Sequence, residues 1–178
     1  MKIAVVSYSY TGNNDRLATC VARDLLATHI KITTQKSVTI GSIMFDMLFN
    51  RTPKVRLNPN SLHKQYDLVL FCAPIWMGQI ASPIRTYLHY LKSNPQSYGF
   101  FTVSGGADGE NPKLFAELLK RTGAKPAIML EQRIKDLIHH NSTPTRNDTS
   151  AYKISEAEAN SLSKVVIKEI NKFINLTN

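Results

Sequence analysis

The sequence predicts an α/β protein built on a doubly wound parallel sheet. Five short apolar segments alternate along the chain with amphipathic helical segments. One of the apolar segments, DLVLF at 67–71, has the continuous hydrophobicity of a strand buried on both faces. This alternation predicts a three-layer domain with five parallel strands, right-handed crossovers and helices on both faces. At 178 residues the chain has the size of one domain, 1–178.

The expected strands share short length and a high content of β-branched, aromatic or other apolar residues. In chain order they are 2–6, 30–33, DLVLF at 67–71, GFFTV at 99–103 and AIML at 127–130. The turn after the first run favours a strand there over a buried helix.

Helices are expected between these strands. Leu17, Val21 and Leu25 repeat at four-residue spacing within a helix over 13–27, and a second helix fits 42–49. Three further helix starts are predicted from capping residues. Ser82 and Asn111 are each followed by a proline, Pro83 and Pro112, and the second of these helices is expected to end near Gly123. Ser155 and Glu158 form a capping box at the start of the last helix. The polar connection over about 131–154 is expected to be a surface excursion.

Composition argues against several functional classes. The chain has no apolar stretch near 18 residues and no signal-peptide cleavage pattern, so a cytoplasmic protein with no membrane partner is expected. Cys20 and Cys72 are far apart in sequence and are expected to be buried. No metal is predicted, because the histidines lack ligand spacing; they are His29, His63, His89, His139 and His140.

The net charge of +9 indicates an acidic partner, a phosphate-bearing ligand or nucleic acid. Nucleic acid is the least favoured of the three, because the basic residues are spread along the chain without an aromatic-interleaved motif. Ligands of doubly wound sheets bind outside the carboxyl ends of the strands, where the strand order reverses. The loops after the first, third and fourth strands are therefore the candidate site.

The first loop is SYTGNN, residues 9–14, and it suits a phosphate. Ser9 and Thr11 offer hydroxyl groups, and Gly12 permits a tight turn. The N–H groups of Asn13 and Asn14 open a helix whose first turn lacks hydrogen-bond partners. An ordinary turn with an asparagine cap is the alternative. The segment matches neither GxxxxGK[ST] nor GxGxxG.

The second loop, CAPIWMGQIASP at 72–83, carries the only tryptophan of the chain. Pro74 and Gly78 bracket Ile75, Trp76 and Met77, so the indole is expected on a turn at the binding edge, where it can stack on a planar ring. A core position for the indole is the alternative. Glycine at 78 also permits a backbone peptide to reorient beside a ligand.

The third loop is SGGADGENP at 104–112. Its adjacent glycines, Gly105 and Gly106, are expected to expose backbone N–H groups at the end of the strand. A flexible connection with no ligand contact is the alternative reading.

Together the three loops resemble the FMN-binding loops of the flavodoxin family, and the resemblance spans nearly the whole chain. The first loop is the most specific part, with Asn14 where the family has a final threonine. The resemblance implies a flavodoxin-like fold with strand order 2-1-3-4-5 and one FMN. The implied role is that of an electron carrier or an FMN-dependent NAD(P)H oxidoreductase. A phosphate-ligand-binding or interaction module without redox activity is the alternative, because a fold does not determine function.

The resemblance also assigns parts of the cofactor to particular residues. Residues Ser9, Tyr10, Thr11, Gly12, Asn13 and Asn14 would hold the FMN phosphate; Ala73, Pro74, Ile75, Trp76, Met77 and Gly78 would flank the isoalloxazine; Ser104, Gly105, Gly106 and Ala107 would reach its polar edge. No side chain is expected to act as a catalytic acid or base. The third loop contains no second aromatic, which leaves one flavin face open to substrate or to a partner.

Charge near these loops is positive. Residues 47–107 contain a single acid, Asp67, against Arg51, Lys54, Arg56, Lys64, Arg85 and Lys92. Such a rim would favour an anionic reduced flavin and attract an acidic redox partner or the phosphates of NADPH. Ordinary solvated surface charges are the alternative.

Overall fold

The computed structural model describes residues 1–61, 65–139 and 143–177, so His63, Lys64 and His140 lie outside the described residues. The main sheet contains the parallel strands β1 (Ile3–Ser7), β2 (Thr28–Lys31), β3 (Leu68–Cys72), β6 (Tyr98–Ser104) and β7 (Met129–Arg133). Their order is β2-β1-β3-β6-β7. This confirms the predicted order 2-1-3-4-5 and the flavodoxin-like doubly wound fold.

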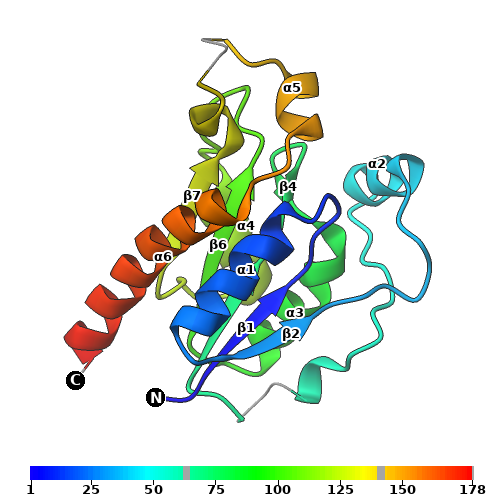
Figure 1. Cartoon of the computed structure of the whole chain (residues 1–178). Helices are drawn as coiled ribbons and strands as arrows, with labels where there is room; N and C mark the ends of the chain where they lie inside the picture. The colour runs from blue at the N-terminus through cyan, green and yellow to red at the C-terminus, as the bar shows by residue number, and fades with distance from the viewer. Residues whose placement is uncertain (62–64, 140–142, 178) are drawn as a thin grey trace.

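Helices cover both faces of the sheet, which gives three layers (Figure 1). Helices α1 (Asn13–Asp24) and α6 (Glu156–Thr177) pack on one face, and α3 (Ser82–Ser93) and α4 (Leu114–Thr122) pack on the other. Successive side chains of β1 point to opposite faces of the sheet: Val5 packs in the core under α1, and Val6 packs in the core under α3. Cys20 and Cys72 are buried free thiols, as predicted.

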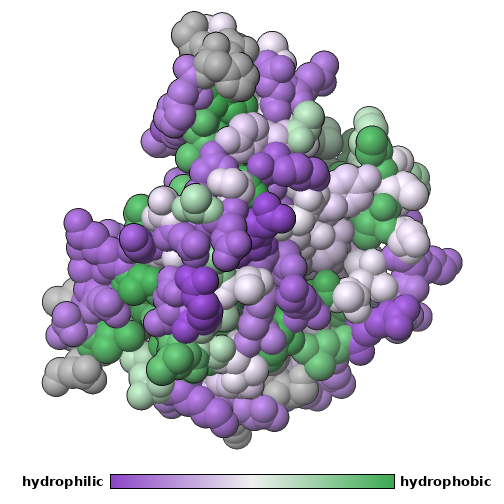
Figure 2. All heavy atoms as spheres, in the orientation of Figure 1, coloured by the Kyte–Doolittle hydropathy of each residue, from purple (hydrophilic) through white to green (hydrophobic). Residues whose placement is uncertain are grey.

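The chain between β2 and β3 leaves the sheet and carries α2 (Ile40–Leu48) and the short 3₁₀ helix η1 (Pro59–Ser61). Thr39 and Ser42 form a capping box at the start of α2. Helix α2 protrudes beside the sheet (Figure 1), and green, hydrophobic atoms lie among white ones over it in Figure 2. The exposed apolar side chains of this segment are Ile40, Met44, Phe45, Leu48 and Phe49.

Two strands are shifted by two residues from the predicted positions. Strand β2 begins at Thr28, and β7 is Met129–Arg133 where 127–130 was predicted. Both lie at the edges of the sheet and are only partly buried, so their outward-facing polar residues hide the strand from a search for apolar runs.

Two predicted helix caps are wrong in detail. Ser82 is the first residue of α3, and its hydroxyl donates to Asp46 Oδ2 (2.8 Å) instead of capping the helix. Helix α4 begins at Leu114, because the Asn111 side chain accepts from the backbone N–H of Lys113 (3.1 Å) and closes a turn ahead of the helix. The tertiary contact at Asp46 cannot be read from the local pattern.

The connection over 131–154 is more structured than a surface loop. It contains the end of β7, the 3₁₀ helix η2 (Ile134–Leu137) and α5 (Arg146–Ala151). Ile134, Ile138 and Ile154 pack into the core under α6. The capping box at its end is confirmed, since the N–H of Glu158 donates to Ser155 Oγ (3.2 Å).

Candidate functional site

The first loop turns sharply into α1. Gly12 has φ 94°, a left-handed conformation that side chains rarely adopt, and it immediately precedes the helix. Its N–H donates to Ser9 Oγ (3.0 Å), which leaves the hydroxyl proton of Ser9 available. The first-turn N–H groups of α1 have no intrahelical acceptor, so this end of the helix is suited to an anion.

The side chains of Asn13 and Asn14 are turned into the protein, and both are buried. Asn14 pairs with the main chain of Val103 in β6, and Asn13 donates to the carbonyl of Tyr152 (2.9 Å) and accepts from the N–H of Ile154 (3.2 Å). These residues can therefore meet a ligand only through their main-chain N–H groups. The Asn14 carboxamide, which occupies the position of the family's threonine, does not replace a hydroxyl donor.

The second loop is a β-hairpin that the sequence did not predict. Strands β4 (Ile75–Trp76) and β5 (Gln79–Ile80) pair antiparallel across a two-residue turn. Met77 and Gly78 both have positive φ, 51° and 76°, as a type I′ turn requires. Met77 is largely exposed, whereas Ala73 is buried in the core and Pro74 accepts from the N–H of Ala81 (3.0 Å).

Trp76 belongs to an aromatic group at the edge of the first loop. Its ring meets Tyr8 edge-on at a centroid distance of 5.8 Å and Tyr10 at 6.2 Å. Trp76 is half-buried and Tyr10 is exposed. Burial raises the pKa of Tyr8 to about 12, so that phenol stays protonated at neutral pH. The indole therefore joins the first loop to the hairpin and keeps part of its surface open.

A cavity of about 660 Å³ lies between the hairpin and the third loop. It is lined by predicted residues of both loops, namely Ile75, Met77, Gly78, Ser104, Gly105, Gly106 and Ala107. Its volume lies within the range of about 300–1,000 Å³ that is usual for small-molecule and cofactor sites. The structure thus brings two of the predicted loops to one cavity. Trp76 and the residues of the first loop do not line this cavity; the contact of Trp76 with Tyr10 joins the first loop to the hairpin.

Close packing around the third loop explains why its two adjacent residues, Gly105 and Gly106, are glycines. A Cβ at Gly105 would lie 3.0 Å from Thr149 Oγ1, and one at Gly106 would lie 2.6 Å from the Cβ of Arg133. Glycine is needed here because α5 and the end of β7 pack closely against the loop. The two glycines therefore do not by themselves indicate a ligand.

Glu131, in the middle of β7, organises the third loop and was not among the predicted site residues. Its carboxylate accepts from the Ser104 hydroxyl (2.7 Å) and from the N–H of Asn111 (3.1 Å). The Asn111 side chain in turn donates to the carbonyl of Gly78 (2.9 Å), which ties the third loop to the hairpin. Glu131 directly follows the predicted strand over 127–130, but the end of that strand was not one of the predicted ligand loops.

Residues of the 131–154 connection also reach the site. Lys153 donates from Nζ to the carbonyl of Thr11 in the first loop (2.7 Å). Arg146, at the start of α5, lines the cavity and forms an ion pair with Asp108 of the third loop (2.9 Å). Nothing in the local sequence places either residue there, because the connection lies far along the chain from the first loop.

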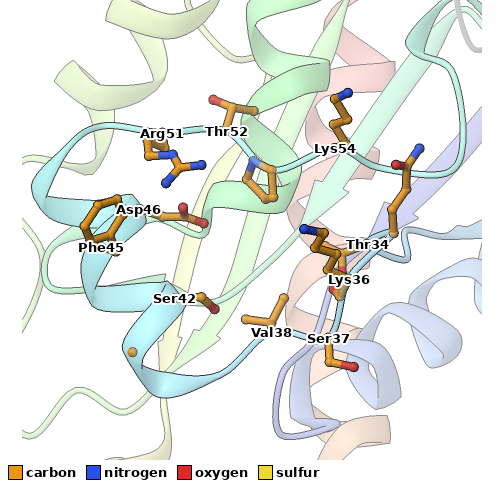
Figure 3. Close-up of a pocket in the computed structure, with 13 residues that line it drawn as sticks. Thr34, Lys36, Ser37, Val38, Ser42, Phe45, Asp46, Arg51, Thr52 and Lys54 are labelled. Atoms are coloured by element: carbon orange, nitrogen blue, oxygen red, sulfur yellow. Dashed lines mark hydrogen bonds between the residues drawn. The ribbon is translucent and has the colours of Figure 1, made fainter.

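A second cavity, of about 770 Å³, lies between α2 and the chain on either side of it. Figure 3 shows Arg51 beside Asp46, with Lys36 and Lys54 toward the other end of the cavity. Arg51 and Lys54 belong to the predicted basic rim and are exposed, as is Arg56.

The other members of the predicted rim are not part of it. Lys92 lies in the last turn of α3, at the opposite edge of the sheet, and Lys64 is outside the described residues. Arg85 is fully buried: its Nε donates to the carbonyl of Ile80 (2.8 Å), and a second nitrogen donates to Gln79 (3.0 Å). Burial, together with the positive charge of Arg121, lowers the pKa of Arg85 to about 10. The rim therefore consists of Arg51, Lys54 and Arg56.

Ser7, Asp15 and His29 lie together below the first loop but do not form a hydrolytic triad. Ser7 Oγ is 2.9 Å from His29 Nε2, yet Asp15 contacts the serine hydroxyl (3.1 Å), and Thr19 faces His29 Nδ1 (3.5 Å). A triad would need the carboxylate on Nδ1 and an accessible serine, and Ser7 is buried. Within the described ranges, no three His, Cys, Asp or Glu residues gather as metal ligands, and no helix there is long and apolar enough to cross a membrane.

Solved structures with a similar fold exist, although no protein-family model matches the chain and no curated protein matches it by sequence. A flavoprotein from Lactobacillus acidophilus NCFM in complex with FMN is 20% identical with a TM-score of 0.62, over 73% of this chain and 92% of that chain. A candidate flavoprotein from Bacteroides eggerthii DSM 20697 is 17% identical with a TM-score of 0.63, and the match covers 93% of this chain and 98% of that chain. Another candidate flavoprotein, from Bacteroides uniformis ATCC 8492, is 16% identical with a TM-score of 0.64, and the match covers 92% of this chain and 97% of that chain. At these identities the likeness shows a shared fold.

Proposed function

We propose that this protein binds one FMN at the carboxyl edge of its sheet and acts in electron transfer or flavin-dependent reduction. The observation that carries the proposal is the meeting of the segments after β1, β3 and β6 at that edge. A cavity of about 660 Å³ lies between the segments after β3 and β6, and Trp76, after β3, contacts Tyr10 of the loop that opens α1. The likeness in fold to a flavoprotein in complex with FMN supports this choice of ligand.

The residues present suit the parts of FMN. The hydroxyls of Ser9 and Thr11 and the first-turn N–H groups of α1 would donate to the phosphate. Trp76 would lie against the isoalloxazine, and the cavity walls at Gly78 and Ser104–Ala107 would surround its polar edge. The flavin, when bound, supplies the transfer of electrons, and the protein tunes it through stacking, hydrogen bonds and nearby charge.

The basic rim supports a negatively charged electron donor or acceptor. Arg51, Lys54 and Arg56 are exposed on the chain that returns from α2. In the described part of residues 47–107 the single acid is Asp67. Such a field would attract an acidic redox protein or the phosphates of NADPH.

An interaction module without redox activity is the second candidate, and helix α2 favours it. Four large apolar side chains of α2, and Phe49 directly after it, are exposed beside the basic rim, a combination that would suit an acidic protein partner. The two candidates differ in whether the chain binds flavin.

The test is a titration of the purified protein with FMN and with riboflavin, followed by visible absorption. We expect a shifted flavin spectrum and an affinity for FMN at least tenfold higher, because the first loop contributes donors that only the phosphate can use. Equal affinity for the two flavins would remove the phosphate assignment. If the protein binds neither FMN nor riboflavin, the result would favour the interaction module without redox activity.

A further inference from the structure

The segment that joins α5 to α6 is held against the first turn of α1, although about 140 positions separate the two in sequence. The Asn13 side chain makes one hydrogen bond to Tyr152 and one to Ile154. The Arg16 guanidinium donates to the carbonyl of Ile154. The main chain on both sides of Lys153 is therefore fixed on the loop of residues 9–14.

Lys153 is exposed, and its ammonium group points to that loop, where it donates to the carbonyl of Thr11 at 2.7 Å. An ammonium group carries three N–H donors, and this contact uses one of them. The other two remain for solvent or for a ligand at the start of α1. Because the contact is to a main-chain oxygen and not to a carboxylate, no neighbouring acid of the loop neutralises the charge.

The loop itself provides no cation for a phosphate. Residues 9–14 contain neither lysine nor arginine. The first turn of α1 adds a carboxylate, Asp15, and a cation, Arg16, whose guanidinium is directed to the carbonyl of Ile154. Lys31 forms an ion pair with Asp15 (2.7 Å), so the charges of these two side chains neutralise each other. The partial charge at the end of a helix is equivalent to about half an elementary charge, against the nearly two negative charges of a phosphate monoester at neutral pH.

We propose that Lys153 contributes the missing positive charge and makes the site selective for the dianionic phosphate of FMN over phosphate-free flavin. The proposal rests on the proposed function and extends it, since it adds to the phosphate site a residue from the opposite end of the chain. Asn13 and Arg16 then act as positioning residues, because they hold the backbone that carries Lys153.

The experiment compares Lys153→Met, Lys153→Arg and the control Lys168→Gln. Lys168 is also exposed but lies roughly 18 Å further along α6, beyond the screening length at physiological salt. Dissociation constants for FMN and riboflavin are measured by flavin fluorescence from pH 5 to pH 8, at low and at physiological salt. Circular dichroism confirms that each variant is folded.

We expect Lys153→Met to weaken FMN binding about tenfold at low salt and riboflavin binding less than twofold. Lys153→Arg should retain most of the affinity, and Lys168→Gln should match the wild type. Wild-type affinity for FMN should rise with pH through the second ionisation of the phosphate, near pH 6, and this rise should be shallower in Lys153→Met. A purely structural lysine would not change the pH profile.

Several results would overturn the proposal. An equal loss for FMN and riboflavin would show that Lys153 supports the fold, and an equal effect of Lys168→Gln would show that only overall charge matters. If the wild type prefers FMN and Lys153→Met keeps that preference, this inference fails while the proposed function stands. If the wild type binds neither flavin, both fail. Independently of any variant, wild-type affinity for FMN should fall with salt while affinity for riboflavin does not, and the absence of that difference would also contradict the proposal.

Discussion

The side chain of Asn14 forms two hydrogen bonds with the main chain of one residue, Val103. Its Nδ2 donates to the Val103 carbonyl at 3.0 Å, and its Oδ1 accepts from the Val103 N–H at 3.0 Å. Val103 lies near the end of β6, directly before the third loop, and Asn14 is the last residue of the first loop and lies in the first turn of α1. One buried carboxamide therefore fixes the relative position of two candidate ligand loops.

Replacement of Asn14 by Ala should destabilise the protein strongly. The change leaves the N–H and carbonyl of Val103 without this partner in a buried place, which costs about 2–4 kcal/mol of unfolding free energy. Urea denaturation measures the loss, and the exposed Asn171→Ala in α6 should change stability by less than about 0.5 kcal/mol. A similar small effect for both variants would show that Asn14 is not an important anchor.

Gly12→Val and Thr11→Ala should both weaken FMN binding. A Cβ at Gly12 would meet no atom within 4 Å, so the cost of valine comes from the positive φ and not from a clash. We expect a loss of about 1–3 kcal/mol of binding or folding free energy for Gly12→Val, and a smaller loss for Thr11→Ala through one hydroxyl donor. Calorimetric FMN titration is the measurement, and unchanged affinity in both variants would move the phosphate site elsewhere.

Trp76 is the only tryptophan, so its fluorescence reports on this site alone. Bound FMN should quench it, and Trp76→Ala should weaken FMN binding about tenfold and shift the flavin reduction potential. The variant Tyr87→Phe provides a comparison, because Tyr87 is buried under α3 and donates to the carbonyl of Leu57. Indole emission that does not respond to saturating FMN would place Trp76 outside the flavin site.

Stability should fall as the pH decreases below about 6.5. Burial lowers the pKa of His29, and Lys31 adds to this, although Asp15 acts in the opposite direction. The unfolded chain, with a histidine pKa near 6.5, then binds the proton more readily than the folded chain. The unfolding free energy should therefore decrease through this window, by at most about 1.4 kcal/mol per pH unit for this group. His29→Asn should make the decrease shallower, and an identical pH profile for the two proteins would exclude His29 as a cause.

Charge reversal of the basic rim should slow reduction of the bound flavin. With Arg51, Lys54 and Arg56 all changed to Glu, reduction by NADPH or by an acidic donor protein should slow at least tenfold at low salt, and the difference should shrink as salt rises. FMN affinity should stay nearly intact, because Arg51 and Lys54 line the cavity beside α2 and none of the three lines the cavity between the hairpin and the third loop. Stopped-flow absorbance measures the reduction rate, and Lys92→Glu at the opposite edge is the control. An unchanged rate of the triple variant at low salt would show that the rim does not attract the electron donor.

The pattern of apolar segments was enough to predict the three layers of the fold, and the strand order followed from the resemblance of the loops to the flavodoxin family. Alternating apolar and amphipathic segments are local signals, and the right-handed crossover rule leaves few ways to assemble them into a parallel sheet. The turn at Gly12 was predictable for the same reason, since its positive φ is a property of one residue and its neighbours. Edge strands were placed less well, because β2 and β7 are only partly buried and their apolar pattern is interrupted.

Which side chains face the candidate site depends on contacts made in the folded protein. The carboxamide of Asn14 pairs with Val103, so only the main-chain N–H of Asn14 faces the predicted ligand position. Arg85 was expected on the rim and is buried, and Gly106 is required by the side chain of Arg133. Lys153 and Glu131 reach the loops from segments that carry no local motif. These outcomes depend on contacts between residues distant in sequence, and the direction of a side chain is set by its partner across the fold and not by its neighbours along the chain.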